Sequence, residues 1–145
     1  MRIVSPTLVL LLSACAGGPV GYAGPTARPR ADAYTCATEQ LTSLGYTLEA
    51  ANRETGQVRG SRQLPGVVAS TEPGKRHFSH IQVSVTQEGA KPVTIRATPT
   101  MIRETGVRTP FGWSTIPGEP DQGGISDANT ILLQCGVADT AIRAG

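Results

Sequence analysis

The two histidines are the first residues to weigh for chemistry, because both lie in the short stretch Lys75-Arg76-His77-Phe78-Ser79-His80. An H-x-x-H pair can supply two of the nitrogen ligands that a zinc ion requires. In a strand, however, side chains three positions apart point to opposite faces, and no third ligand stands nearby in the sequence. We therefore expect exposed histidines beside a basic cluster, with no metal site and no cofactor.

The sequence also lacks the patterns that place a nucleophile beside a base. No serine stands in a G-x-S-x-G motif, and neither histidine has an obvious carboxylate partner. Glu119 and Asp121 form an acidic pair, but they lie in a loop rich in proline and glycine. We predict a protein that is not an enzyme, with a hydrolase as the weaker alternative.

Cys36 and Cys135 lie near opposite ends of residues 32–145, about 100 residues apart. In an oxidising compartment, such a pair forms a disulfide more naturally than a catalytic or redox dyad. The chain-entropy account gives a bridge of this span a stabilisation of about 4.7 kcal/mol. We predict a Cys36–Cys135 disulfide, and two unpaired buried thiols are the alternative.

The third cysteine ends an apolar leader. Arg2 precedes an apolar run over residues 3–14 that is too short to span a bilayer, which takes roughly 20 residues. The leader continues into Leu12-Ser13-Ala14-Cys15, which resembles the lipobox of bacterial lipoprotein precursors: a leucine, two small residues and a cysteine. The layout also fits a plain secretory signal, and a buried N-terminal strand with an incidental cysteine is a further alternative.

The resemblance implies that the thiol of Cys15 receives a diacylglyceryl group and that the chain is cut just before it. Residues 1–14 are then a signal peptide, and fatty acyl groups such as palmitate hold the protein on a membrane. Ala16 follows the cysteine, whereas lipoproteins kept in the inner membrane often carry Asp there. The expected location is the outer membrane, facing the periplasm.

Residues 15–31 and 32–145 differ in composition. The first range is rich in Gly, Pro and Ala without hydrophobic periodicity, which predicts a flexible linker behind the lipidated cysteine. The second range has the length of a single domain. The formal net charge is only +2, and arginines alternate with acidic residues, so we expect no nucleic-acid partner.

Periodicity within residues 32–145 predicts a helix, two hairpins and a second helix. The first helix covers residues 33–44, with Asp32 as its cap and Gly45 as its stop. The second is capped by Ser126, and its apolar residues recur at helical spacing from Ile131 to Ile142. The hairpins join residues 46–50 to 57–62 and residues 81–86 to 93–98, and they are followed by Pro99, which predicts a bulge or an edge. Residues 64–79 and 105–124 read as irregular loops.

This order predicts an α+β domain of two layers. Both helices cover one face of a four-stranded antiparallel sheet, because each amphipathic element needs an apolar surface to pack against. Neighbouring helices would also bring the two distal cysteines within bonding reach. We recognise no family for the folded domain.

The two irregular loops are the candidate interaction surface. Phe111 and Trp113 are aromatic residues on a loop, a type favoured at interfaces, and Lys75 and Arg76 form a basic tip on the other loop. The alternative for the two aromatics is that they fold back to seal one end of the core. The predicted function is a non-enzymatic binding or structural module of the cell envelope, with an envelope protein or glycan as partner.

A second function remains open from the sequence. A small ligand or a lipid would bind in a pocket between the helices and the sheet. Such a pocket would be lined by Leu41, Ile81, Val83 and Ile131.

Overall fold

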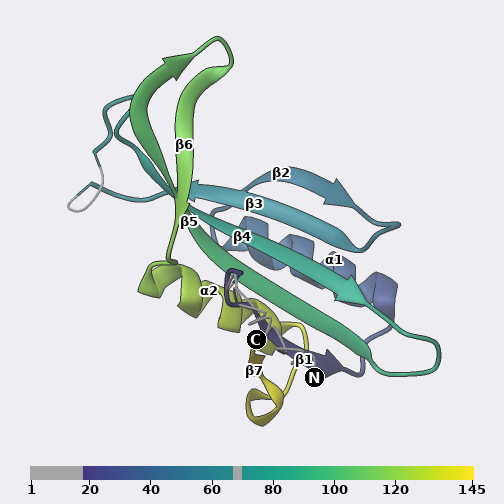
Figure 1. The fold of residues 1–145 in the computed structure, drawn as a ribbon. Helices are drawn as coiled ribbons and strands as arrows, with labels where there is room; N and C mark the ends of the chain where they lie inside the picture. The colour runs from purple at the N-terminus through teal and green to yellow at the C-terminus, as the bar shows by residue number, and fades with distance from the viewer. Residues whose placement is uncertain (1–17, 67–69) are drawn as a thin grey trace, which may run out of the picture.

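The computed structural model describes residues 18–66 and 70–145, so Cys15 and the leader lie outside the described residues. Two helices pack on one face of an antiparallel sheet (Figure 1). The elements in chain order are β1 (Tyr22–Thr26), α1 (Arg30–Ser43), β2 (Thr47–Asn52), β3 (Gln57–Gln63), β4 (His77–Thr86), β5 (Val93–Thr109), β6 (Gly112–Gly118), α2 (Gln122–Gln134), a short 3-10 helix (Asp139–Ala141) and β7 (Arg143–Ala144).

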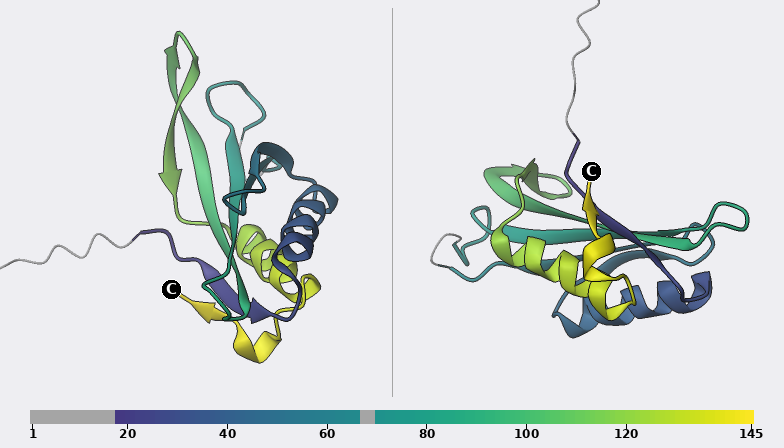
Figure 2. Two further views of the ribbon diagram at one scale, coloured as in Figure 1. Left: turned by 90° about the vertical axis from the view of Figure 1, so that its right-hand side faces the viewer. Right: turned by 90° about the horizontal axis from the view of Figure 1, so that it is seen from below.

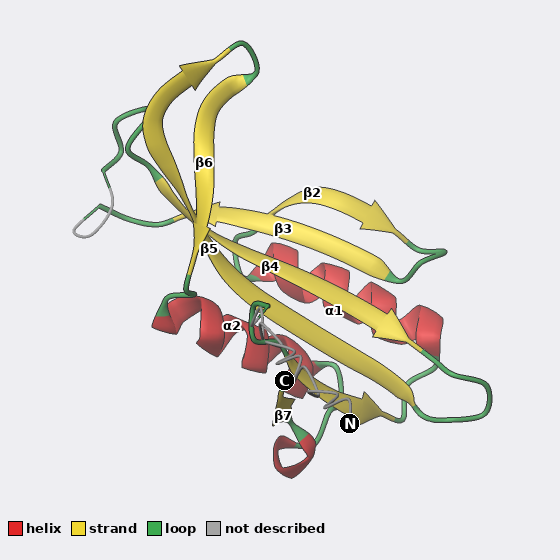
Figure 3. Cartoon of the chain, viewed as in Figure 1, coloured by secondary structure: helices red, strands yellow, loops and turns green. Residues whose placement is uncertain are grey.

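The α+β class and the two hairpins are confirmed, but the sheet has seven strands rather than four. Its order is β2-β3-β4-β5-β1-β7, and β6 pairs with the far part of β5. The colouring by secondary structure in Figure 3 shows both helices on the same side of this sheet. The three additional strands come from the predicted linker, from the predicted loop over residues 105–124 and from the end of the predicted second helix.

The predicted linker contains strand β1. Residues Tyr22–Thr26 pair with Ala97–Val93 of β5, and Thr26 donates a buried hydrogen bond from its hydroxyl to the carbonyl of Cys135 at 2.9 Å. The folded part of the chain therefore begins well before residue 32. Local composition hides this strand because its pairing partner lies more than 60 residues away.

Both helices begin earlier than the sequence predicts. Helix α1 begins at Arg30, directly after Pro29, so that Asp32 lies in its first turn instead of capping it. An acidic residue there still interacts favourably with the helix dipole. Helix α2 begins at Gln122, and Ser126 lies inside it rather than at its N-terminus.

A glycine ends each helix. Gly45 has a φ of 83° and Gly136 a φ of 86°, which side chains disfavour. The residue after each glycine completes the Schellman motif that ends a helix. The N–H of Tyr46 donates to Leu41 O, and that of Val137 donates to Leu132 O. The second helix therefore stops at Gln134, and the prediction that it continues to residue 142 is wrong.

Pro99 lies inside the long central strand β5, not at an edge or a bulge. Its pairing with β4 continues unbroken to Arg103. Backbone groups of successive residues in an antiparallel strand point alternately to the two neighbouring strands. The N–H of Glu104 donates to Arg76 O, so even-numbered residues of β5 in this region bond to β4. The nitrogen of Pro99 therefore faces the opposite side of β5, away from β4. On that side β1 pairing ends at Ala97 and β6 pairing begins at Met101. Pro99 thus occupies the gap between two partner strands, where no N–H is needed.

The core fills the space between the helices and the sheet. Its largest fully buried side chains include Leu41, Ile81, Ile95, Ile131 and Leu132. The predicted disulfide is present: Cys36 on α1 and Cys135 at the end of α2 have Cα atoms 5.7 Å apart. The bridge links the two helices, which lie side by side on one face of the sheet (Figure 2).

Substituting Gly24 by valine tests whether β1 belongs to the fold. A Cβ at Gly24 would overlap with Cγ1 of Val137 and lie 3.2 Å from Ala141 O. We expect the free energy of unfolding to fall by about 1–3 kcal/mol through overpacking, measured by urea denaturation. Gly18→Val is the matched control, because nothing lies within 4 Å of its Cβ position. Equal stabilities of the two variants would mean that residues 22–26 are a linker after all.

Candidate interaction arm

A two-stranded arm projects from the sheet beyond His77, the first residue of β4. We define the arm as residues 104–118: the last part of β5, a tight turn and β6 (Figures 1 and 2). Pairing of β4 with β5 ends at Arg103, and from there β5 pairs only with β6. The prediction of an irregular loop over residues 105–124 is therefore wrong, because residues 104–118 form a hairpin.

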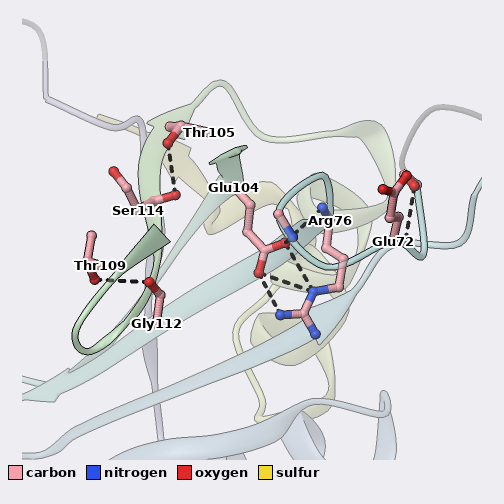
Figure 4. A network of polar contacts seen from close by, with 9 residues as sticks. Glu72, Arg76, Glu104, Thr105, Thr109, Gly112 and Ser114 are labelled. Atoms are coloured by element: carbon pink, nitrogen blue, oxygen red, sulfur yellow. Dashed lines mark hydrogen bonds and ion pairs between the residues drawn. The ribbon is translucent and has the colours of Figure 1, made fainter. Parts of the chain in front are cut away.

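The turn at the tip is fixed by local hydrogen bonds. The hydroxyl of Thr109 donates to Gly112 O at 3.0 Å and accepts a bond from the N–H of Phe111 at 3.3 Å. Gly112 has a φ of 127°, a conformation that suits glycine. Further down, Thr105 donates to Ser114 O across the two strands (Figure 4). These bonds hold the turn that carries Phe111.

Phe111 is fully exposed at this turn, while Trp113 is not. Among the residues that the structure describes, none covers the Phe111 ring, and Val107 and Ile116 on the same arm are also exposed. Trp113 instead packs on the loop at Gly74, where an added Cβ would lie 2.9–3.1 Å from three of its ring atoms. The Arg108 guanidinium lies 5.4 Å from the centre of the Trp113 ring. Trp113 therefore braces the arm, and Phe111 is its presented residue.

The base of the arm is held by Glu104. The Arg76 guanidinium donates to both of its carboxylate oxygens at 2.6–3.1 Å, and the backbone N–H groups of Gly74 and Arg76 donate at 2.6 and 3.0 Å (Figure 4). These bonds, that of the guanidinium foremost, lower the pKa of Glu104 to about 2. The loop before β4 is thereby fastened to the arm.

The four residues of the predicted interaction surface are thus only partly free. Arg76 is engaged by Glu104, and Lys75 pairs with Glu72 at 3.0 Å near the surface. Trp113 lies against the same loop, so the two predicted loops adjoin each other. Phe111 is the one residue of the four that is fully exposed.

The Glu104 pairing predicts a pH dependence. A carboxyl whose pKa falls from 4.5 to about 2 on folding contributes stability above pH 4.5, and this contribution disappears as the pH falls through 2. We expect Glu104→Gln to be less stable than the unsubstituted protein at neutral pH, with the difference closing between pH 4.5 and 2. Thermal unfolding across this range measures it. A difference independent of pH would show that the ionised carboxylate is not the cause.

His77 and His80 both lie on β4 and are half-buried, so the expectation of exposed histidines and of a loop that reaches residue 79 is wrong. The Nε2 atom of His80 lies 3.5 Å from Glu49 Oε1, and burial lowers the pKa of His80. Within residues 18–66 and 70–145, no group of three or more His, Cys, Asp or Glu side chains is arranged to hold a metal ion.

A polar cluster between α2 and the sheet was not foreseen from the sequence. The Tyr46 hydroxyl lies 2.9 Å from Ser79 Oγ and donates to Asp127 at 2.9 Å, and Arg62 donates to the same carboxylate at 2.7 Å. Burial is the main cause that raises the pKa of Tyr46 to about 12. Ser79 therefore has a protonated phenol beside it rather than a base, and Asp127 is neutralised by Arg62. The cluster fastens α2 to the sheet, and its chemistry is structural.

The side-chain pairs that bond to each other in this cluster and at the arm base lie 28 to 81 positions apart in the sequence. No short motif joins them, so no local signal in the sequence could have identified either group. No protein-family model matches the chain, and the curated proteins include none that matches it.

Proposed function

We propose that this protein is a lipid-anchored, non-enzymatic binding module of the cell envelope, and that the arm is its contact surface. The observation that carries the proposal is the fully exposed Phe111 ring at the tip of an arm that is braced at its base. Exposing an aromatic ring of this size to water is unfavourable, so the arm is suited to a surface that covers it. The lipid would confine the protein to the membrane and so raise the local concentration of its partner.

The anchor rests on the lipobox resemblance at Cys15. The disulfide between Cys36 and Cys135 is consistent with it, because such bonds persist in oxidising compartments, of which the periplasm is one. Ala16 after the cysteine favours the outer membrane over the inner one. In the part of the chain that the structure describes, no helix is long and apolar enough to cross a membrane.

The packing of the core gives no support to the alternative of a pocket between the helices and the sheet. The side chains that would line it, Leu41, Ile81, Val83 and Ile131, are all fully buried within one core cluster. The hydrolase alternative has no support from the Ser79 cluster, where the serine has no base to activate it.

Site-specific photocrosslinking in the native envelope tests the arm as a contact surface. A photoreactive residue replaces Phe111 in one variant and Leu133 in the other, since Leu133 is also an exposed hydrophobic residue but lies on α2. We expect Phe111, and not Leu133, to give a defined adduct with one envelope component. The same adducts from both positions, or none from Phe111, would contradict the proposal.

A further inference from the structure

The exposed hydrophobic side chains of this protein are not scattered. Of the five large ones among the described residues, four belong to the N-terminal segment or to the arm, and the fifth is Leu133 on α2. The four are Val20, Val107, Phe111 and Ile116. Single exposed hydrophobics are ordinary, whereas a concentration of them in adjoining segments marks an interaction site.

The two segments lie on the same side of the protein. Both views in Figure 2 place the N-terminal segment that begins at Gly18 and the arm on the side of the sheet away from the helices. A groove of about 600 Å³ continues this surface, and its lining includes Val20 from the N-terminal segment, Pro117 from the arm and Ile125 from α2. Cys15 precedes Gly18 by three residues, which span at most about 10 Å. A lipid on Cys15 would therefore be attached near the groove at the base of the arm.

The charge of the arm is one-sided as well. Residues 105–118 include Arg108 and no acidic residue, and Arg103 is exposed where the arm leaves the sheet. Glu104 is buried and paired with Arg76, so its charge is compensated. Glu119 is the exposed acidic residue directly after the arm. The arm thus presents an apolar tip with Arg108 three positions away, and Arg103 lies at its base.

We propose that the arm docks on an anionic lipid bilayer, with Phe111 inserted among the headgroups and Arg108 near the lipid phosphates. This inference rests on the proposed function and names the partner of the same arm. Apolar side chains partition into the bilayer interface, and each cation near an anionic surface strengthens binding by roughly fivefold. The apolar arm lies on the side of the protein where the chain would be lipidated. A bilayer partner accounts for this placement, whereas a protein partner could be contacted from any side.

Trp113 provides a direct measurement, because it is the only tryptophan of the chain and lies on the arm. The chain from residue 15 onward with Cys15→Ser contains every described residue and lacks the lipid. It is titrated with vesicles of phosphatidylglycerol, and with vesicles of phosphatidylcholine for comparison. We expect cosedimentation with the anionic vesicles and a change in Trp113 fluorescence, because Arg108, which lies over its ring, would meet the lipid phosphates. Salt should weaken both effects.

Substitutions assign the binding to the arm. We expect Phe111→Ala to weaken vesicle binding by at least about tenfold and Arg108→Ala by about fivefold, while the control Leu133→Ala leaves it unchanged. Phe111 is fully exposed, so its loss leaves the fold intact, and circular dichroism verifies this.

Three results would overturn the inference: no binding to either vesicle, equal binding to neutral vesicles, or binding that Phe111→Ala leaves unchanged. The proposed function is tested separately, by the crosslinking experiment. If Phe111 crosslinks to a protein in the envelope while the anionic vesicles are not bound, the arm is still a contact surface but its partner is that protein.

Discussion

Replacing both Cys36 and Cys135 by alanine is expected to lower the free energy of unfolding by about 2–5 kcal/mol. The bridge joins residues 99 positions apart, so it removes much of the conformational freedom of the unfolded chain. Both cysteines are buried in the core, and the smaller alanine side chains also leave space behind. Urea denaturation of the oxidised protein and of the double variant measures the difference.

Reduction of the unsubstituted protein is the control for this prediction. It breaks the bond but keeps both sulfur atoms, so the loss of stability on reduction isolates the covalent link from the loss of packing. We expect reduction to account for the larger part of the effect. Stabilities of the oxidised protein and the double variant within about 0.5 kcal/mol would show that the bridge contributes little to this fold.

Changing Cys15 to serine is expected to move the protein from the membrane fraction to the soluble fraction. A hydroxyl in place of the thiol cannot form the thioether that carries the lipid. Two or three acyl chains provide an attachment that washing with salt does not reverse. Fractionation of cells that produce either protein, with immunodetection, provides the measurement.

Ala16→Ser is the matched control for Cys15→Ser, because it introduces the same residue at the neighbouring position and keeps the thiol. It should stay in the membrane fraction. If Cys15→Ser also remains firmly bound after a salt wash, the membrane attachment does not depend on this cysteine.

Some of the fold follows from local pattern. The alternation of residues 81–86 and 93–98 predicts the β4–β5 hairpin, because a sheet with one covered face requires a period of two. The disulfide was predicted from a pair of cysteines in an oxidising compartment, and the placement of both helices on one face from their amphipathic patterns. The hairpin depends on residues that are close together in the sequence. The disulfide joins the two cysteines that remain once Cys15 is assigned to the lipid.

The missed strands depend on partners that are distant in sequence. Residues 22–26 include a glycine and a proline, which argue against a strand locally, yet they pair with β5 over more than 60 positions. Pro99 was interpreted as an interruption because its missing N–H removes a ladder bond. In the fold, that nitrogen faces the gap between β1 and β6, where no ladder bond would form.

The sequence identified residues of the candidate site but not the role of each one. Phe111 and Trp113 were singled out as aromatic residues on a predicted loop. Composition could not show that Phe111 is exposed to solvent while Trp113 packs on the loop at Gly74. Gly74 decides it, because the absence of a side chain there lets the Trp113 ring pack on the loop. The role of Arg76 was likewise hidden, since its partner Glu104 lies 28 positions away and had no signal of its own.

The central claim is that the protein is anchored by a lipid on Cys15. Intact-mass spectrometry of the protein extracted from its native membranes tests this claim most directly. We predict a chain that begins at Cys15 and carries the added mass of a diacylglyceryl group, with or without a further acyl chain. A chain that still begins at Met1, or an unmodified thiol at position 15, would contradict the account.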